Sequence, residues 1–206
     1  TNLSADANLA FNTDIDGTTR GGTWDIGADE NIRAIYYSVG TSTADLKRTA
    51  DVTITNGTNA EFNAFQFDHI GVGDKVIYNG VTAYITGRTD STHYTMATAT
   101  GAALTNGGPY ALTSINRAFN SMNAALTTAD DSGYLATSNL VTGEYQLNLA
   151  CYNDGVDTTR QSALVGIEID GWTTGADNYI RIYTPVSSSE VGISQRHTGI
   201  TGTGYT

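Results

Sequence analysis

Between residues 32 and 100 the chain is a succession of short runs rich in Ile, Val, Tyr, Phe and Thr, most of them ended by Gly or Asn-Gly. Such residues favour strands, while Gly and Asn accept the positive φ values of tight turns. The pattern is clearest in DKVIYNGVTAYITGR, residues 74–88, where Asn79-Gly80 separates two alternating runs. We expect a β-hairpin with a type I′ turn there. The regular spacing of the runs predicts a small β-barrel or sandwich over residues 32–110.

The apolar period changes in TSINRAFNSMNAALTTADDSG, residues 113–133. Apolar residues recur there at steps of three and four, which predicts one amphipathic helix near 114–129 that packs on the β core. Thr113 or Ser114 can cap its start, and Gly133 can end it. The apolar stripe consists of Ile115, Phe119, Met122 and Leu126.

Period-two alternation returns after this helix, in GEYQLNLACYND, SALVGIEIDGW and NYIRIYTPV. Their spacing of about twenty residues favours stacked coils of a parallel β-helix over a hairpin meander, although composition alone does not separate the two. We therefore expect a mainly β chain, with a helix and β-helix-like or sandwich strands over 111–206. Cys151 lies in the first of these runs and is the single cysteine, so no internal disulfide exists and a buried free thiol is expected.

Composition and charge restrict the partners. The chain has 10 Lys and Arg against 21 Asp and Glu, a formal net charge of -11, which disfavours nucleic acid. No apolar run is long enough for membrane insertion. Only 15% of the residues are charged, and Gly, Thr, Ser and Asn take the polar positions, as in secreted or surface-layer β proteins. We expect a secreted or cell-surface location.

The segment 11–30 places oxygen-bearing side chains at alternate positions and a glycine after them, as in the first half of a calcium loop. The match then weakens, because Arg20 stands at the ninth position and Thr23 at the twelfth, where a bidentate Glu is expected. The segment is thus either a calcium site or a turn whose Asp side chains bond local N–H groups. The calcium hypothesis names Asn12, Asp14, Asp16 and Asp25.

Both ends of the chain carry a family resemblance. DIDGTTRGGTWDIGADE resembles the closing segment of secreted bacterial right-handed parallel β-helix surface proteins, and IEIDGWTTGADNYIRIYTP resembles the opening coils of such a helix. The resemblance implies an N-terminal capping segment (1–31) and an unfinished β-helix at the other end. Such an end leaves backbone N–H and C=O groups open to another chain.

We therefore expect a structural protein and not an enzyme, since no catalytic motif stands out. Its copies would join head to tail into an extracellular filament or stalk, with the N-terminal segment of one copy completing the open β edge of the next. The residues expected to fill apolar slots in that contact are Leu3, Leu9, Phe11 and Ile15.

The alternative function is a carbohydrate-binding or carbohydrate-active β-helix module that takes a polysaccharide. Trp24 and Trp172 lie beside glycine-rich turns and acidic residues, where an exposed indole can act as a sugar platform. The same tryptophans can instead be buried caps of the β core, because Trp is mostly covered in folded proteins.

Overall fold

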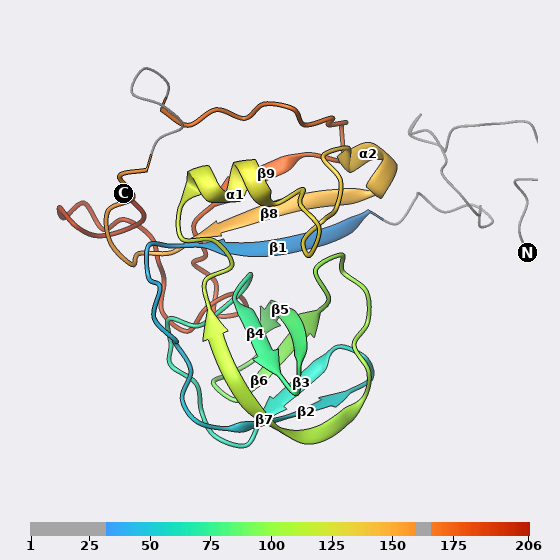
Figure 1. The fold of residues 1–206 in the computed structure, drawn as a ribbon. Coiled ribbons are helices and arrows are strands. Elements are labelled where there is room, and N and C mark those ends of the chain that lie inside the picture. The colour runs from blue at the N-terminus through green and yellow to red at the C-terminus, as the bar shows by residue number, and fades with distance from the viewer. Residues whose placement is uncertain (1–31, 160–165) are drawn as a thin grey trace, which may run out of the picture.

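The computed structural model of the chain describes residues 32–159 and 166–206, which form a mainly β structure (Figure 1). The elements of this part are β1 (Arg33–Val39), β2 (Asp51–Thr55), β3 (Asn59–Phe62), β4 (Lys75–Tyr78), β5 (Val81–Arg88), β6 (His93–Ala97), β7 (Gly107–Asn116), α1 (Met122–Thr128), α2 (Leu140–Gly143), β8 (Tyr145–Cys151) and β9 (Ile180–Tyr183).

Strands β2 to β7 close into an antiparallel barrel with the order β2-β3-β6-β5-β4-β7, which confirms the predicted small barrel. Alternate residues point inward, so that Val52 and Ile54 of β2 are buried between exposed or half-buried neighbours. The interior is therefore a packed core and not a channel. Its largest fully buried side chains are Ile54, Phe62, Ile70, Ile85, Met96 and Ile115.

The predicted hairpin is confirmed. Strands β4 and β5 pair antiparallel with Tyr78 opposite Val81, so Asn79 and Gly80 form a two-residue loop. Their φ angles are 46° and 74°. Two successive positive φ values are what a type I′ turn requires, and its twist matches that of the flanking strands.

Strands β1, β8 and β9 form a separate 3-stranded parallel sheet with β8 in the middle. Since β1 precedes the barrel and β8 follows it, the barrel is inserted between two neighbouring strands of this sheet. The predicted alternating faces of β8 and β9 are confirmed, and side chains stack across the strands in columns. The columns of one face are Ile35–Leu147–Ile180 and Tyr37–Leu149–Ile182. The structure shows a parallel sheet here, and it does not show a β-helix.

The predicted helix at 114–129 is wrong in its first half. Strand β7 continues to Asn116, past the predicted domain boundary at residue 110, because Ile115 points into the barrel core and pairs with Val76 of β4. Helix α1 begins only after Ser121, whose side chain accepts a hydrogen bond from Ala124 N at 3.0 Å. Because apolar residues recur at three- and four-residue steps across both elements, the prediction treated the end of β7 and the following helix α1 as one helix.

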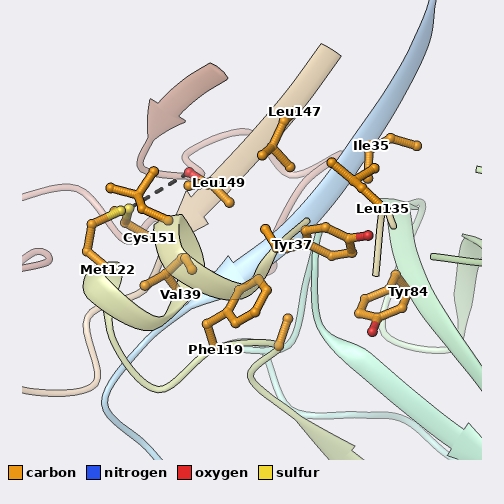
Figure 2. Packing of buried hydrophobic residues seen from close by; sticks show 14 of the residues in the cluster. Ile35, Tyr37, Val39, Tyr84, Phe119, Met122, Leu135, Leu147, Leu149 and Cys151 are labelled. Atoms are coloured by element: carbon orange, nitrogen blue, oxygen red, sulfur yellow. Dashed lines mark hydrogen bonds between the residues drawn. The ribbon is translucent and has the colours of Figure 1, made fainter. Parts of the chain in front are cut away.

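A second core lies between the parallel sheet and α1 (Figure 2). Tyr37 is fully buried at its centre and makes edge-to-face contacts with the rings of Tyr84, Phe119 and Tyr134. Cys151 is 3% exposed in the same core, and burial raises the pKa of its thiol to about 12. The thiol is therefore protonated at neutral pH and unreactive.

Two other predicted strands differ from the structure. The run AEFNAFQFDHI, residues 60–70, was expected to be one strand, but β3 ends at Phe62. Beyond it Gln66 is buried, and its side chain accepts a hydrogen bond from Arg48 N and donates one to Ala64 O. In SALVGIEIDGW, the described residues 166–172 form no strand. The Asp170 side chain accepts from Gly171 N there, and Gly171 has a φ of 78°, which turns the chain.

Candidate functional site: the two edges of the parallel sheet

The barrel covers the β1 edge of the parallel sheet. Gly73, between the barrel strands, accepts a hydrogen bond from Ser38 N at 2.9 Å. Phe119, after β7, donates its N–H to Ser38 O at 3.0 Å and accepts from Gly40 N at 3.1 Å. These bonds use the backbone groups that an added strand would need at this end of β1.

A barrel loop also packs against side chains of β1. Tyr37 Oη donates to Ala99 O at 2.7 Å, and Arg33 Nη1 donates to Thr100 O at 3.4 Å. Gly101 packs so closely on β1 that a Cβ atom there would lie 2.9 Å from Ile35 Cδ1. In Figure 1 the strands accordingly step away from the barrel in the order β1, β8, β9.

A buried ionic cluster fixes the barrel to the sheet. Arg117, after β7, donates from Nη1 to both oxygens of Asp74 at 2.7 and 2.8 Å, and from Nε and Nη2 to Asp154 at 2.6 and 3.0 Å. Its Nη2 also donates to His69 O at 3.2 Å, and the guanidinium lies 3.6 Å from the ring centroid of Tyr152. Asp74 precedes β4, whereas Tyr152 and Asp154 follow β8, so the cluster joins the two units.

Burial and the neighbouring charges shift the pKa values of this cluster in opposite directions. Burial tends to lower the pKa of Arg117, but the two carboxylates raise it above its ordinary value. Burial raises the pKa of Asp74, and the bound guanidinium and the N–H of Gly71 oppose that rise. The cluster therefore has a structural role, in which each buried charge is neutralised by an opposite charge beside it.

The β9 edge is open within the described residues. Strand β9 pairs with β8 on one side, and no described strand pairs with its other side. Ile182 ends the column Tyr37–Leu149–Ile182 and is 44% exposed, whereas Tyr37 and Leu149 are fully buried. The column therefore stops where one more strand would continue it.

Further apolar side chains are exposed in the segment that precedes β9, and β9 itself carries one cation. Ile167 and Ile169 are 43% and 54% exposed, in the described segment before β9. Arg181 lies on the opposite face of β9 from Ile182, and its guanidinium stands 4.0 Å from the ring centroid of Tyr183. An exposed apolar edge with one cation is a surface suited to strand addition.

The barrel also carries a polar groove of about 460 Å³ on its outer face. His93 and Glu61 lie opposite each other on β6 and β3, with 4.0 Å between His93 Nε2 and Glu61 Oε1. One carboxylate oxygen of Asp90 lies 2.9 Å from Nδ1 of His93, and the other accepts a hydrogen bond from Thr92 N. The groove therefore brings a carboxylate, an imidazole and hydroxyl groups close together.

Most of the predicted site residues lie outside the described residues. Trp172 is described, and it is half-buried against the core, where its Nε1 donates to Leu126 O of α1 at 3.3 Å. This position fits a cap of the core better than a sugar platform. The predicted residues outside the described part are Asn12, Asp14, Asp16 and Asp25 for calcium, Leu3, Leu9, Phe11 and Ile15 for subunit contact, and Trp24 for carbohydrate.

The described part of the chain has neither a metal-binding cluster nor a helix that could cross a membrane. Within residues 32–159 and 166–206, no three His, Cys, Asp or Glu side chains are grouped so that they would hold a metal ion. Neither α1 nor α2, nor any other helix of these residues, has the length and apolar character that a membrane crossing requires.

Comparisons with known proteins give no relative. The chain matches no protein family model, no curated protein and no solved structure. What the chain does must therefore be inferred from its own residues.

Sequence reasoning missed the residues that close the β1 edge. Gly73 precedes a predicted strand, and Arg117 lies within the predicted helix 114–129. Neither residue has a local sequence pattern that indicates a contact between the barrel and the sheet. The alternation of β9 placed Ile180 and Ile182 on one face, but it carried no signal that β9 lies at the edge of the sheet.

Proposed function

We propose that the chain is a structural subunit of an extracellular filament or surface stalk, in which a neighbouring copy completes the open edge of the parallel sheet. The observation that carries the proposal is the contrast between the two edges. The barrel covers β1, whereas β9 has no described partner on its outer side and exposes Ile182.

This contrast limits what can pair with the open edge. Pairing of β9 with the β9 edge of a second copy would close a two-fold dimer, and β1 is covered by the barrel, so a filament requires that a different segment, the N-terminal one, complete the β9 edge of the next copy. A contact between the open edge and a different surface of the next copy repeats without closing, which is the geometry of a filament. The inserted barrel then acts as the cap that keeps β1 from pairing.

The resemblance and the composition support the location and the architecture of this proposal. The terminal segments resemble the end and the beginning of secreted parallel β-helices, and a three-stranded parallel sheet with in-register apolar columns is compatible with the first strands of such a helix. The low content of charged residues, 15%, is typical of secreted surface proteins.

Deleting residues 1–16 should leave a folded protein that no longer assembles, because the strand that completes the neighbour's edge is removed. Negative-stain electron microscopy over rising protein concentration measures assembly, and circular dichroism checks the fold. A chain in which a Gly-Ser segment of the same length replaces residues 1–16 is the matched control for length, and it should also fail to assemble.

Regular fibres from the full chain and dispersed particles from both variants would support the proposal. Fibres from the truncated chain, or dispersed full-length chains at every concentration, would overturn it. Loss of fibres after calcium chelation would make Asn12, Asp14, Asp16 and Asp25 the ligands to mutate.

The polar groove supports carbohydrate binding as a second candidate function. The groove has a volume of about 460 Å³, and hydroxyl, amide and carboxylate groups of the kind that bind sugar hydroxyls line it. If this function holds, Glu61→Gln should abolish saturable binding on a glycan array, whereas Asp131→Asn, on an exposed residue away from the groove, should not. An array without saturable binding would exclude it.

A further inference from the structure

The open edge of β9 presents a defined pattern to an added strand. Ile180 and Ile182 point toward the core side of the sheet, and Arg181 points to the other face. Because side chains alternate along a strand, a partner strand must place two side chains against Ile180 and Ile182. The residue between them then faces Arg181.

Arg181 determines the charge of that middle residue. Its side chain is exposed, it stacks on Tyr183, and it has no ion pair within the described part of the chain. Opposite charges on directly opposed positions of neighbouring strands stabilise a sheet, and like charges destabilise it. The partner strand should therefore carry an acidic residue at this position.

The sequence supplies such a strand in FNTDID, residues 11–16, which alternates larger side chains with Asn and Asp. Resting on the proposed function, we propose that residues 11–16 of a second copy pair with β9 in the parallel direction, in one specific register. The proposed pairs are Thr13–Ile180, Asp14–Arg181, Ile15–Ile182 and Asp16–Tyr183.

The proposed function requires a second copy as the donor. Residue 32 leads into β1, on the edge opposite β9, with β8 between them. A segment that paired with β9 of its own copy would fill the open edge and leave no strand contact to the next copy. A doubly substituted Ile15→Cys/Ile182→Cys chain distinguishes the two donors.

Charge selects this register over a more apolar one. Moving the segment by four residues would place Leu9 and Phe11 against Ile180 and Ile182, but Ala10 would then face Arg181. That register leaves the cation without an acidic partner. The proposed register gives it Asp14, and it keeps Ile15 as the continuation of the Tyr37–Leu149–Ile182 column.

Disulfide trapping between two variants tests the register. A full-length Ile15→Cys chain is mixed with a full-length Ile182→Cys chain and oxidised mildly. Directly opposed positions on neighbouring strands lie about 4.8 Å apart, within the range that a disulfide spans. Cys151 is buried with a raised pKa, so wild-type chains should give little background. The matched control is Phe11→Cys mixed with Ile182→Cys, which reports the shifted register.

The proposal expects the Ile15→Cys mixture to give about tenfold more covalent dimer than the Phe11→Cys mixture, because a register shift of four residues separates the thiols by about 13 Å. More dimer from Phe11→Cys would overturn the register. More dimer from Ile15→Cys with Ile180→Cys than with Ile182→Cys would overturn the parallel direction. A doubly substituted Ile15→Cys/Ile182→Cys chain that closes on itself while the mixture gives no dimer would overturn the second copy as donor.

Electron microscopy of the same samples separates this inference from the proposed function. Fibres without preferential Ile15–Ile182 trapping would overturn the register and leave assembly standing. Samples with neither fibres nor dimers would overturn both. As a second measurement, Arg181→Glu should reduce fibre formation about tenfold, and adding Asp14→Arg to the same chain should restore it, because the pair of opposite charges is re-formed.

Discussion

Replacing Arg117 with methionine should lower the free energy of unfolding by about 3–5 kcal/mol, because it leaves two carboxylates buried without their counter-ion. The side chain of Arg117 is 1% exposed, and those of Asp74 and Asp154 are 0% and 11% exposed, so water cannot replace the lost hydrogen bonds. Urea unfolding followed by circular dichroism measures the change. Since the cluster joins the barrel to the parallel sheet, the two units should also unfold less cooperatively. The free energy of unfolding would then depend less steeply on urea concentration.

The matched control for Arg117 is an exposed ion pair of the same barrel. Lys47 and Asp45 form a salt bridge in which 22% and 38% of the side chains are exposed. Lys47→Ala should cost less than about 1 kcal/mol, as exposed pairs usually do. Equal effects of Lys47→Ala and Arg117→Met would show that the buried cluster does not hold the two units together.

Local patterns in the sequence predicted the elements whose partners are near in the chain. The hairpin around Asn79-Gly80 was predictable because one turn fixes both strands. The inward faces of β8 and β9 were predictable because alternation does not depend on the identity of the partner strand.

The elements that depend on distant partners were not predictable in the same way. Strand β7 pairs with both β2 and β4 and closes the barrel, yet its apolar spacing continued into α1 and read as one helix. Likewise β1 pairs in parallel with β8, so that Ile35 lies opposite Leu147 although all the barrel strands stand between these two residues in the sequence. Only tertiary contacts decide such pairings, so the covered edge of β1 has no sequence signature.

The candidate site shows the same division. The alternation of β9 predicted that Ile180 and Ile182 share one face. That β9 is the edge strand and that Ile182 is exposed came from the structure. The residues that cover β1, Gly73 and Phe119, are placed there by the closure of the barrel. Sequence therefore predicted which side chains share a face, and the structure was needed to show which edge of the sheet is covered and which is open within the described residues.

Replacing Gly73 with alanine should be among the most destabilising single-methyl changes in this chain, because Gly73 is where the barrel backbone closes on the β1 edge. A Cβ atom there would lie 2.3 Å from Ser38 N and 2.4 Å from Tyr37 C, and both are backbone atoms that cannot rotate away. The φ of 84° adds the strain that any L-residue has in the left-handed region. We expect a loss of more than about 4 kcal/mol, measured by urea unfolding, or failure to fold.

Gly80 separates the two causes. It has a similar φ of 74° in the hairpin turn, and nothing lies within 4 Å of a Cβ atom built there. Gly80→Ala should therefore cost only the backbone strain, about 1–2 kcal/mol. The difference between the two variants measures the contact of the barrel with β1. If Gly73→Ala costs no more than Gly80→Ala, the barrel does not press on this edge, and the asymmetry of the sheet that favours head-to-tail assembly would lose its physical basis.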